Sequence, residues 1–331
     1  MKYNEIVDLS GWIEKDIDVG RGTREKVVLK QSKQGKVYFF AKTYDKNIGE
    51  LRSEVCASMI GRVFKFPVQR SWLCVIPQYK TFKLPLSVDI GVLIQLDVRR
   101  QRYTKRGEFR ENLVHGAALI ANFDDRFNDL TTNGERRNFY TLSVVVSSIR
   151  KYVAEKRGVE EIWRQFFELI VFDALIGGTD RHYYNWGVLE RADDGSFVKL
   201  SPAFDNGISL LWKMKDYKKQ FLDSIFDGKF ISNTKSMFKK DGGGKYNLFE
   251  ALTEVYKNPE YVNSGIVEGV RHKISSVPLG YLKRSLMNNV PKSSQFETSS
   301  EELLHIFEYV RLRLGILKLT LDEIIENQNK I

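Results

Sequence analysis

The stretch GGTDRHYYNWG, residues 177–187, joins two predicted elements of different kinds. Residues 159–176 before it carry apolar side chains at helical spacing, and the glycine pair that opens the stretch predicts the end of that helix. After it, two short apolar runs at 186–189 and 197–200 flank an Asp-Asp-Gly turn signal, which predicts a hairpin. The stretch is therefore predicted to be a loop between a buried helix and a pair of strands.

Polar residues of this loop have the spacing of a phosphoryl-transfer site. Asp180 and Asn185 stand five positions apart, as do the aspartate that meets the acceptor and the metal-binding asparagine of the protein-kinase catalytic loop. Asp205 follows the predicted hairpin and could bring a carboxylate to the same metal. Magnesium takes few protein oxygens besides substrate phosphates, so one asparagine and one aspartate suffice. We predict that Asp180 orients the acceptor hydroxyl and that Asn185 and Asp205 hold Mg²⁺, while local loop capping is the simpler alternative for all three.

The N-terminal part of the chain has the texture of a small β-rich unit. Residues 26–30 and 36–42 predict strands joined by a turn, and residues 18–23, which include two glycines, predict a hairpin tip. Residues 50–64 have helical spacing, and residues 92–96 are typical of a short buried strand.

The remainder of the chain is predicted to be mainly helical. Helical spacing recurs over residues 111–122, 140–156 and 303–325, and a polar, glycine-rich loop is expected at 239–245. The sequence therefore predicts an α+β fold of two lobes, like that of protein kinases. The small β-rich N-lobe would span residues 1–93 and bind nucleotide phosphates, and the larger, mainly helical C-lobe would span residues 94–331 and carry the catalytic loop and metal site.

Composition indicates a folded protein that meets anionic partners. Hydrophobic residues make up 42% of the chain, and the formal net charge of +10 favours nucleotides, nucleic acid, acidic proteins or membrane surfaces without choosing among them. The two cysteines, Cys56 and Cys74, are flanked by apolar residues and are expected to be buried, reduced thiols. No signal peptide and no apolar run of about 20 residues is recognisable, so we expect a cytoplasmic protein without a transmembrane segment.

The residues around the loop resemble those of the HipA-like kinases. In that family a helix leads into a D-x-H-x-x-N loop, which a strand pair and an L-S-P-x-(Y/F)-D segment follow; here the segment is LSPAFD at residues 200–205. The tighter loop form, D-R-H-x-x-N-W-G, resembles the short single-chain branch of the family. The resemblance is sharp between residues 166 and 209 and faint elsewhere. It implies an ATP- and Mg²⁺-dependent kinase whose acceptor is a protein serine or threonine.

The resemblance also implies how the nucleotide phosphates are held. Lys42 resembles the strand lysine that contacts the phosphates, and Glu54 resembles its ion-pair partner. Gly20 and Gly22 would cover the phosphates, although Glu25 stands where the third glycine of G-x-G-x-x-G would fall, so backbone amides would do the holding. A solvated strand end for Lys42, an exposed helix position for Glu54 and a plain turn for the glycines remain the alternatives.

Two further features are expected from the resemblance. Adenine would lie against the strand that carries Ile94, Gln95 and Leu96. Thr23 is the hydroxyl residue of the phosphate-covering stretch and would be a site of inactivating autophosphorylation, unless it is an inert loop residue. His182 is expected to brace the loop by hydrogen bonds rather than to act as a base.

Partners and competing functions follow from the same features. A toxin, a toxin–antitoxin regulator or an effector is the implied setting, and a small antitoxin-type protein could supply the N-terminal subdomain that this chain is expected to lack. The basic stretch at residues 99–110 could bind nucleic acid or another acidic partner, unless it is a solvated insertion. Type II phosphatidylinositol 4-kinases have a similar D-R-x-x-x-N-W loop and D-N-G segment, so a lipid kinase is one alternative. A catalytically inactive nucleotide-binding scaffold is the other.

Overall fold

A computed structural model gives the structure of the chain. It describes residues 1–15, 26–35, 37–43, 47–77, 90–96, 111–154, 156, 159–191, 195, 198–213, 231–257 and 262–328.

The N-terminal part forms a six-stranded sheet with strand order β1-β5-β6-β4-β3-β2. Side chains alternate between its faces, so that Phe39 and Ala41 point to one face and Phe40 and Lys42 to the other. The face with Phe39 is covered by residues of the N-terminal segment such as Leu9 and Trp12. The strands are β1 (Val7–Asp8), β2 (Ile13–Lys15), β3 (Lys26–Lys30), β4 (Phe39–Lys42), β5 (Ser71–Val75) and β6 (Ile90–Gln95).

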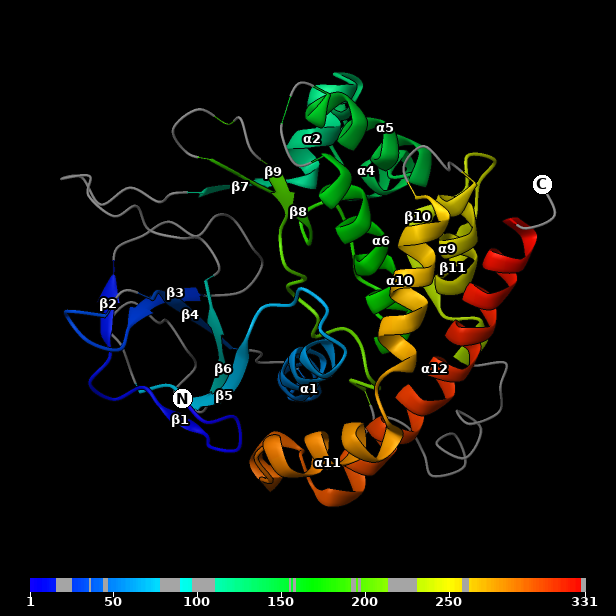
Figure 1. Cartoon of the computed structure of the whole chain (residues 1–331). Coiled ribbons are helices and arrows are strands. Elements are labelled where there is room, and N and C mark those ends of the chain that lie inside the picture. Colours follow the sequence, from blue (N-terminus) through cyan, green and yellow to red (C-terminus); the bar gives the residue numbers. More distant parts are fainter. Residues whose placement is uncertain are drawn as a thin grey trace.

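Helix α1 (Gly49–Val63) lies between this sheet and the helical part of the molecule (Figure 1). Its Leu51 and Val55 pack on the sheet, and its Met59 and Ile60 pack in the core of the helical part. Arg52 is completely buried and donates from Nη2 to the carbonyl of Leu211 at 2.9 Å. The helix is therefore fixed to both lobes.

A three-stranded antiparallel sheet, β7-β8-β9, begins the C-terminal part. Its strands are β7 (Glu111–His115), β8 (Gly187–Arg191) and β9 (Val198–Leu200). Ser201 donates its amide to the carbonyl of Gly187 at 2.8 Å. The β8–β9 hairpin therefore places the end of the loop that precedes β8 and the segment that follows β9 at the same end of this sheet.

The C-terminal part is otherwise helical apart from the hairpin of β10 (Lys235–Lys239) and β11 (Lys245–Asn247). Its core is formed largely by α6, whose Phe166, Phe167 and Phe172 are almost completely buried. Helices α6, α10 and α12 run alongside one another on the side away from the large sheet (Figure 1). The helices are α2 (Gly116–Phe123), α3 (Arg126–Asp129), α4 (Asn133–Phe139), α5 (Leu142–Val153), α6 (Val159–Ile176), α9 (Leu248–Tyr256), α10 (Ser264–Ser275), α11 (Leu279–Asn289), the 3₁₀ turn η2 (Ser294–Phe296) and α12 (Ser300–Gln328).

The expected two-lobed α+β fold is confirmed. One element was predicted wrongly: residues 111–115 form strand β7, because they pair with β8, and the helix begins only at Gly116. The glycine-rich stretch expected as a loop is the turn between β10 and β11. The proposed lobe boundary between residues 93 and 94 falls inside β6, and that division remains a proposal.

Two predictions from composition can also be compared with the structure. Cys56 and Cys74 are free and buried, as expected, and burial raises the pKa of the Cys56 thiol to about 12. Within the described ranges, no helix combines the length and the apolar character that crossing a membrane requires.

Candidate active site

The loop that carries Asp180 starts at a tightly packed helix end. Helix α6 stops at Ile176, and Gly177 follows with φ +67°, a backbone conformation that favours glycine. A Cβ atom on Gly177 would lie 2.1 Å from the hydroxyl of Tyr309 on α12. A glycine is therefore required here by both backbone conformation and space.

Arg181 holds the loop and the segment of Asp205 together from inside. Its guanidinium is buried and forms two hydrogen bonds with the Asp173 carboxylate on α6, at 2.8 and 3.0 Å. The Nη1 atom of Arg181 also donates to the carbonyls of Asn185, at 2.8 Å, and Phe204, at 2.6 Å. One nitrogen thus fixes the residue before Asp205 beside the asparagine of the loop.

The backbone of the loop is braced further by its own side chains and by aromatic residues. The amide of Tyr184 donates to His182 Nδ1 at 3.1 Å, which supports the bracing role expected of this histidine. Tyr140 donates its hydroxyl to the carbonyl of Arg181 at 3.0 Å and accepts from the Trp186 indole at 2.8 Å. A loop fixed in this way can hold reacting groups in position without reorganisation.

Asp180 and Asn185 are presented by this braced loop. Asn185 donates from Nδ2 to the carbonyl of Asp180 at 2.8 Å, and the described residues give its Oδ1 no hydrogen bond. Burial raises the pKa of the Asp180 carboxyl; His182 opposes this shift and the carboxylate of Asp205 adds to it. Burial lowers the pKa of His182, so the imidazole is neutral near pH 7. Asp180 can therefore accept a hydrogen bond or a proton from a hydroxyl that is brought beside it.

Asp205 meets Lys42 across the two lobes. The Lys42 ammonium lies 2.6 Å from Asp205 Oδ1, although the residues are 163 positions apart in sequence. Asp205 has φ +56°, which is uncommon for a residue other than glycine, and its side chain is 43% exposed. Lys42 is 3% exposed, which excludes the solvated strand end that was the alternative from the sequence.

Glu54 lies on α1 beside the same lysine. Its Oε2 is 4.0 Å from the Lys42 ammonium, and its Oε1 accepts from Asn206 Nδ2 at 3.4 Å. Burial raises the pKa of Glu54, and Lys42 opposes that shift. Glu54 is 1% exposed, which excludes the exposed helix position that was the alternative from the sequence.

Sequence reasoning missed the neighbours of Lys42 on its own face of the sheet. Lys26 stands directly opposite Lys42, and Val28 opposite Phe40, in the β3–β4 register. Burial lowers the pKa of Lys26, the adjacent Lys42 lowers it further, and Asp205 opposes both. Like charges directly opposite one another destabilise a strand pair, so an anion beside Lys26 and Lys42 would be favourable. The hairpin register between the two predicted strands was the signal that could have identified Lys26.

The residues expected at the adenine site lie at the end of β6. Ile94 is completely buried with Leu51 and Val55 of α1. Leu96 is half-buried and donates its amide to the carbonyl of Tyr38 at 2.9 Å. Contact of Ile94 and Leu96 with adenine remains a proposal. Several predictions lie outside the described residues, namely those on Gly20, Gly22, Thr23 and the basic stretch 99–110.

The donor set is suited to a magnesium ion. Asn185 and Asp205 offer an amide oxygen and a carboxylate, the hard oxygen donors that Mg²⁺ prefers. Across the part of the chain that the structure describes, no cluster of three or more His, Cys, Asp or Glu side chains has the arrangement of a metal site. A site completed by substrate phosphates and water would need no such cluster.

The family model described as HipA-like C-terminal domain matches residues 20–224, which include the lysine strand, the catalytic-type loop and the Asp205 segment. The chain belongs to this HipA-like family.

Among proteins of known activity, this HipA-like chain is similar to the serine/threonine-protein kinase CtkA of Helicobacter pylori. The two are 33% identical over 92 residues, which amount to 27% of this chain and 28% of CtkA. The aligned part thus spans less than a third of that relative.

Two solved structures share the fold of the HipA-like chain. The crystal structure of the proinflammatory kinase CtkA of Helicobacter pylori has a TM-score of 0.69 at 18% identity, covering 98% of this chain and 99% of that one. HipA of Shewanella oneidensis MR-1, in a toxin–antitoxin complex with HipB and operator DNA, has a TM-score of 0.58 at 11% identity, covering 94% of this chain and 67% of that one. At these identities the likeness establishes the two-lobed kinase-like fold.

Proposed function

We propose that this HipA-like protein is an ATP- and magnesium-dependent serine/threonine protein kinase. The contact between Lys42 and Asp205 carries the proposal, because it joins the sheet lysine to the segment after β9 at 2.6 Å. Asp180 and Asn185 lie on the adjoining loop, which Arg181 ties to the same segment. The similarity to CtkA supports the serine/threonine class.

Each residue has a distinct part in the proposed transfer. Lys42 and Lys26 would hold the phosphates of ATP, with Glu54 keeping Lys42 directed into the cleft. Asp180 would orient the acceptor hydroxyl and take its proton, for which a raised pKa is favourable. Mg²⁺ held by Asn185 and Asp205 would neutralise charge on the phosphate oxygens.

The biological setting is proposed from the relatives. The HipA structure contains HipB and operator DNA, which supports a small antitoxin-type protein as a partner of this chain in the cytoplasm. Co-expression with such a candidate, followed by size-exclusion chromatography, tests for a stable complex. Two separate elution peaks would contradict this partner.

Transfer of labelled phosphate to different acceptors tests the function. The protein is incubated with Mg²⁺ and γ-labelled ATP, together with either a cell extract or phosphoinositide vesicles, and compared with Asp180→Ala and Asp205→Ala. We expect label in protein bands that both substitutions abolish. Label in lipid alone would replace the proposal with a lipid kinase, and no substitution-sensitive transfer would leave a nucleotide-binding scaffold.

Autophosphorylation at Thr23 is part of the proposal and has its own test. Intact-mass and peptide analysis after incubation with Mg-ATP should find phosphate on Thr23, and Thr23→Ala should remove it. Phosphate confined to other residues would contradict this assignment.

A further inference from the structure

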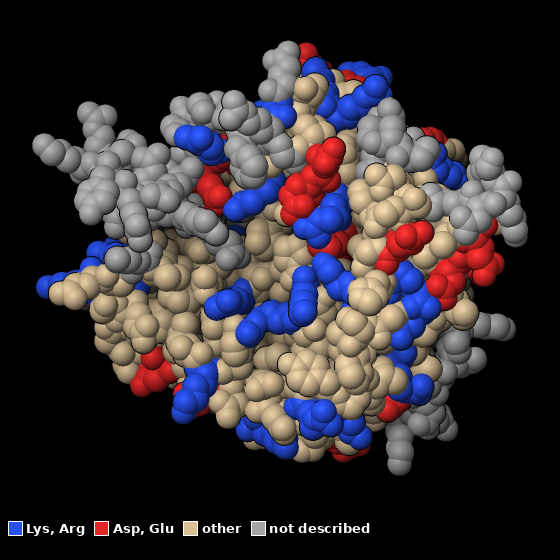
Figure 2. Space-filling model, viewed as in Figure 1, with Lys and Arg blue, Asp and Glu red and all other residues tan. Residues whose placement is uncertain are grey.

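A second pocket opens where the end of α1 meets α6 and α10. Its volume is about 390 Å³, and it is lined by none of the residues proposed for ATP or magnesium. Lys and Arg side chains surround a hollow in the middle of the face drawn in Figure 2, between the large sheet and helices α6 and α10. Four of the lining side chains are cationic, namely Arg62, Lys65, Arg164 and Lys273.

Positive charge exceeds negative charge around this pocket. Glu168, which is 2% exposed, accepts hydrogen bonds from both Arg164 and Lys273 on its Oε1 atom, and Arg164 also pairs with Glu161. Lys65, just after the end of α1, is exposed, and the described residues form no ion pair with it. The Arg62 guanidinium lies over the Tyr3 ring, so Lys65, Arg164 and Lys273 are the cations that remain. Against the two carboxylates they leave an excess of one positive charge, which an anion would balance.

The pocket also contains a hydrogen-bond acceptor that has no donor. Glu168 Oε2 is buried, and the described residues provide it with no hydrogen-bond partner. Leaving a buried carboxylate oxygen unsatisfied costs free energy, so a donor from a bound molecule would be favourable here. An occupant that suits the pocket therefore combines an anionic group with an N–H or O–H group.

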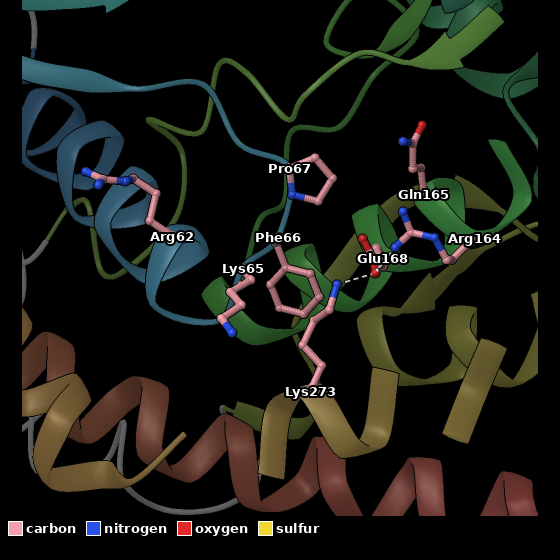
Figure 3. A pocket seen from close by; sticks show the side chains of 8 residues that line it. All are labelled: Arg62, Lys65, Phe66, Pro67, Arg164, Gln165, Glu168 and Lys273. Atoms are coloured by element: carbon pink, nitrogen blue, oxygen red, sulfur yellow. Dashed lines mark hydrogen bonds and ion pairs between the residues drawn. The ribbon is translucent and has the colours of Figure 1, made fainter. Parts of the chain in front are cut away.

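One wall of the pocket is apolar. The Phe66 ring and the Lys273 ammonium lie against Glu168, whereas the Arg62 guanidinium points away (Figure 3). The Lys273 nitrogen is 5.4 Å from the centre of the Phe66 ring, and Pro67 continues the wall. A carbon skeleton could pack on this wall while its anionic group meets the ammonium ions of Lys65 and Lys273.

We propose that this pocket binds a phosphate monoester that also carries a hydrogen-bond donor. The ester is supplied either by a small phosphorylated metabolite or by a phosphorylated serine or threonine side chain. The site is separate from the nucleotide cleft, and its occupation requires no phosphoryl transfer by this protein.

Hydrogen bonds connect the pocket to the strand that leads to Asp205. Gln165, which lines the pocket, accepts from the amide of Leu200 on its Oε1 at 2.8 Å. The carbonyl of Pro67 accepts from the amide of Ala203 at 2.8 Å. The amides of Leu200 and Ala203 therefore report on binding in the pocket.

A titration followed by NMR tests the proposal. ¹⁵N-labelled protein is titrated with O-phosphoserine, with a phosphoserine peptide, and with serine as the uncharged reference, while the Leu200 and Ala203 amide shifts are recorded. We expect saturable shifts with both phosphate esters and none with serine. A peptide that binds more tightly than O-phosphoserine identifies a phosphorylated side chain as the source, and equal affinity identifies a small metabolite.

Substitutions distinguish the pocket from other cationic sites. Lys273→Ala should weaken binding about tenfold, because a charge-assisted hydrogen bond is lost. Lys65→Gly should also weaken binding. This variant should fold normally, because Lys65 has φ +58°, a conformation that glycine prefers. Lys292→Ala, at an exposed position elsewhere, and Lys42→Met, in the nucleotide cleft, should leave binding unchanged. Affinity that stays at the wild-type value in both pocket variants, or shifts that Lys42→Met abolishes, would overturn the proposal.

Discussion

The Lys42 ammonium and the Asp205 carboxylate lie 2.6 Å apart, and this ion pair joins the N-terminal sheet to the segment that follows β9. Lys42 is buried, and Glu54 Oε2 lies 4.0 Å from its ammonium. In the proposed kinase, the phosphates of ATP would bind Lys42 and Mg²⁺ would bind Asp205, in place of the direct contact between the two residues.

The first prediction concerns Lys42. Lys42→Met keeps the length of the side chain and removes its charge, so we expect the rate of phosphoryl transfer to fall about 100- to 1000-fold while the protein stays folded. Single-turnover transfer with saturating ATP measures the rate, and circular dichroism checks the fold. Lys292→Met, at an exposed position, is the matched control. Full activity in Lys42→Met would show that this lysine has no part in the reaction.

The second prediction separates the backbone of Asp205 from its carboxylate. Asparagine tolerates the left-handed conformation that Asp205 adopts at φ +56°, so Asp205→Asn should fold normally and lose its magnesium-dependent activity. Asp205→Ala should lose the activity as well and unfold about 1 kcal/mol more easily, because alanine is strained there. Urea denaturation together with a magnesium titration of the rate distinguishes the two effects. Magnesium dependence that survives in Asp205→Asn would contradict the assignment of this metal ligand.

The third prediction is the pH dependence of transfer. Asp180 acts as the carboxylate, and burial raises its pKa, so activity should fall on acidification at a pH above about 3.9, the ordinary value for aspartate. In the pH–rate profile, Asp180→Asn should lose this acid limb along with about 100- to 10,000-fold of the rate. An acid limb that persists in Asp180→Asn and disappears in His182→Gln would assign the titration to the histidine instead.

The fourth prediction concerns Arg181, which sequence reasoning did not single out. Arg181→Met leaves the buried Asp173 carboxylate without its partner and should lower the free energy of unfolding by about 3–5 kcal/mol. The double variant Arg181→Met/Asp173→Asn removes the unpaired charge and should recover part of this loss. Urea denaturation measures all three proteins, with Arg284→Met as the exposed control. Equal destabilisation in the single and double variants would contradict a charge interaction between Arg181 and Asp173.

Local patterns were sufficient to predict the elements around the loop. Helix α6 was predicted to its last residue because its apolar spacing and the following glycines coincide with a real helix end. Strand β3 was likewise predicted over its full length from consecutive β-branched and apolar residues. The short strands β1 and β5 were not predicted, because β1 is defined by its pairing with β5, which is distant in sequence.

The sequence predicted the polar residues of the candidate site, but not the residue that holds them in position. Asp180, Asn185 and Asp205 follow a recognisable spacing, and the structure brings Asp205 to Lys42. Arg181 lies in the same loop, but its contacts with Asp173 and Phe204 depend on how α6 and the β8–β9 hairpin pack. No spacing along the chain contains that information.

Phosphoamino-acid analysis of the transfer products tests the central claim most directly. The protein is incubated with Mg²⁺, γ-labelled ATP and a cell extract, and labelled protein from wild type, Asp180→Asn and Asp205→Asn is hydrolysed and separated. A serine/threonine kinase predicts labelled phosphoserine or phosphothreonine with the wild type and background levels with both variants. Equal label with the wild type and the variants, or no labelled phosphoserine or phosphothreonine at all, would contradict it.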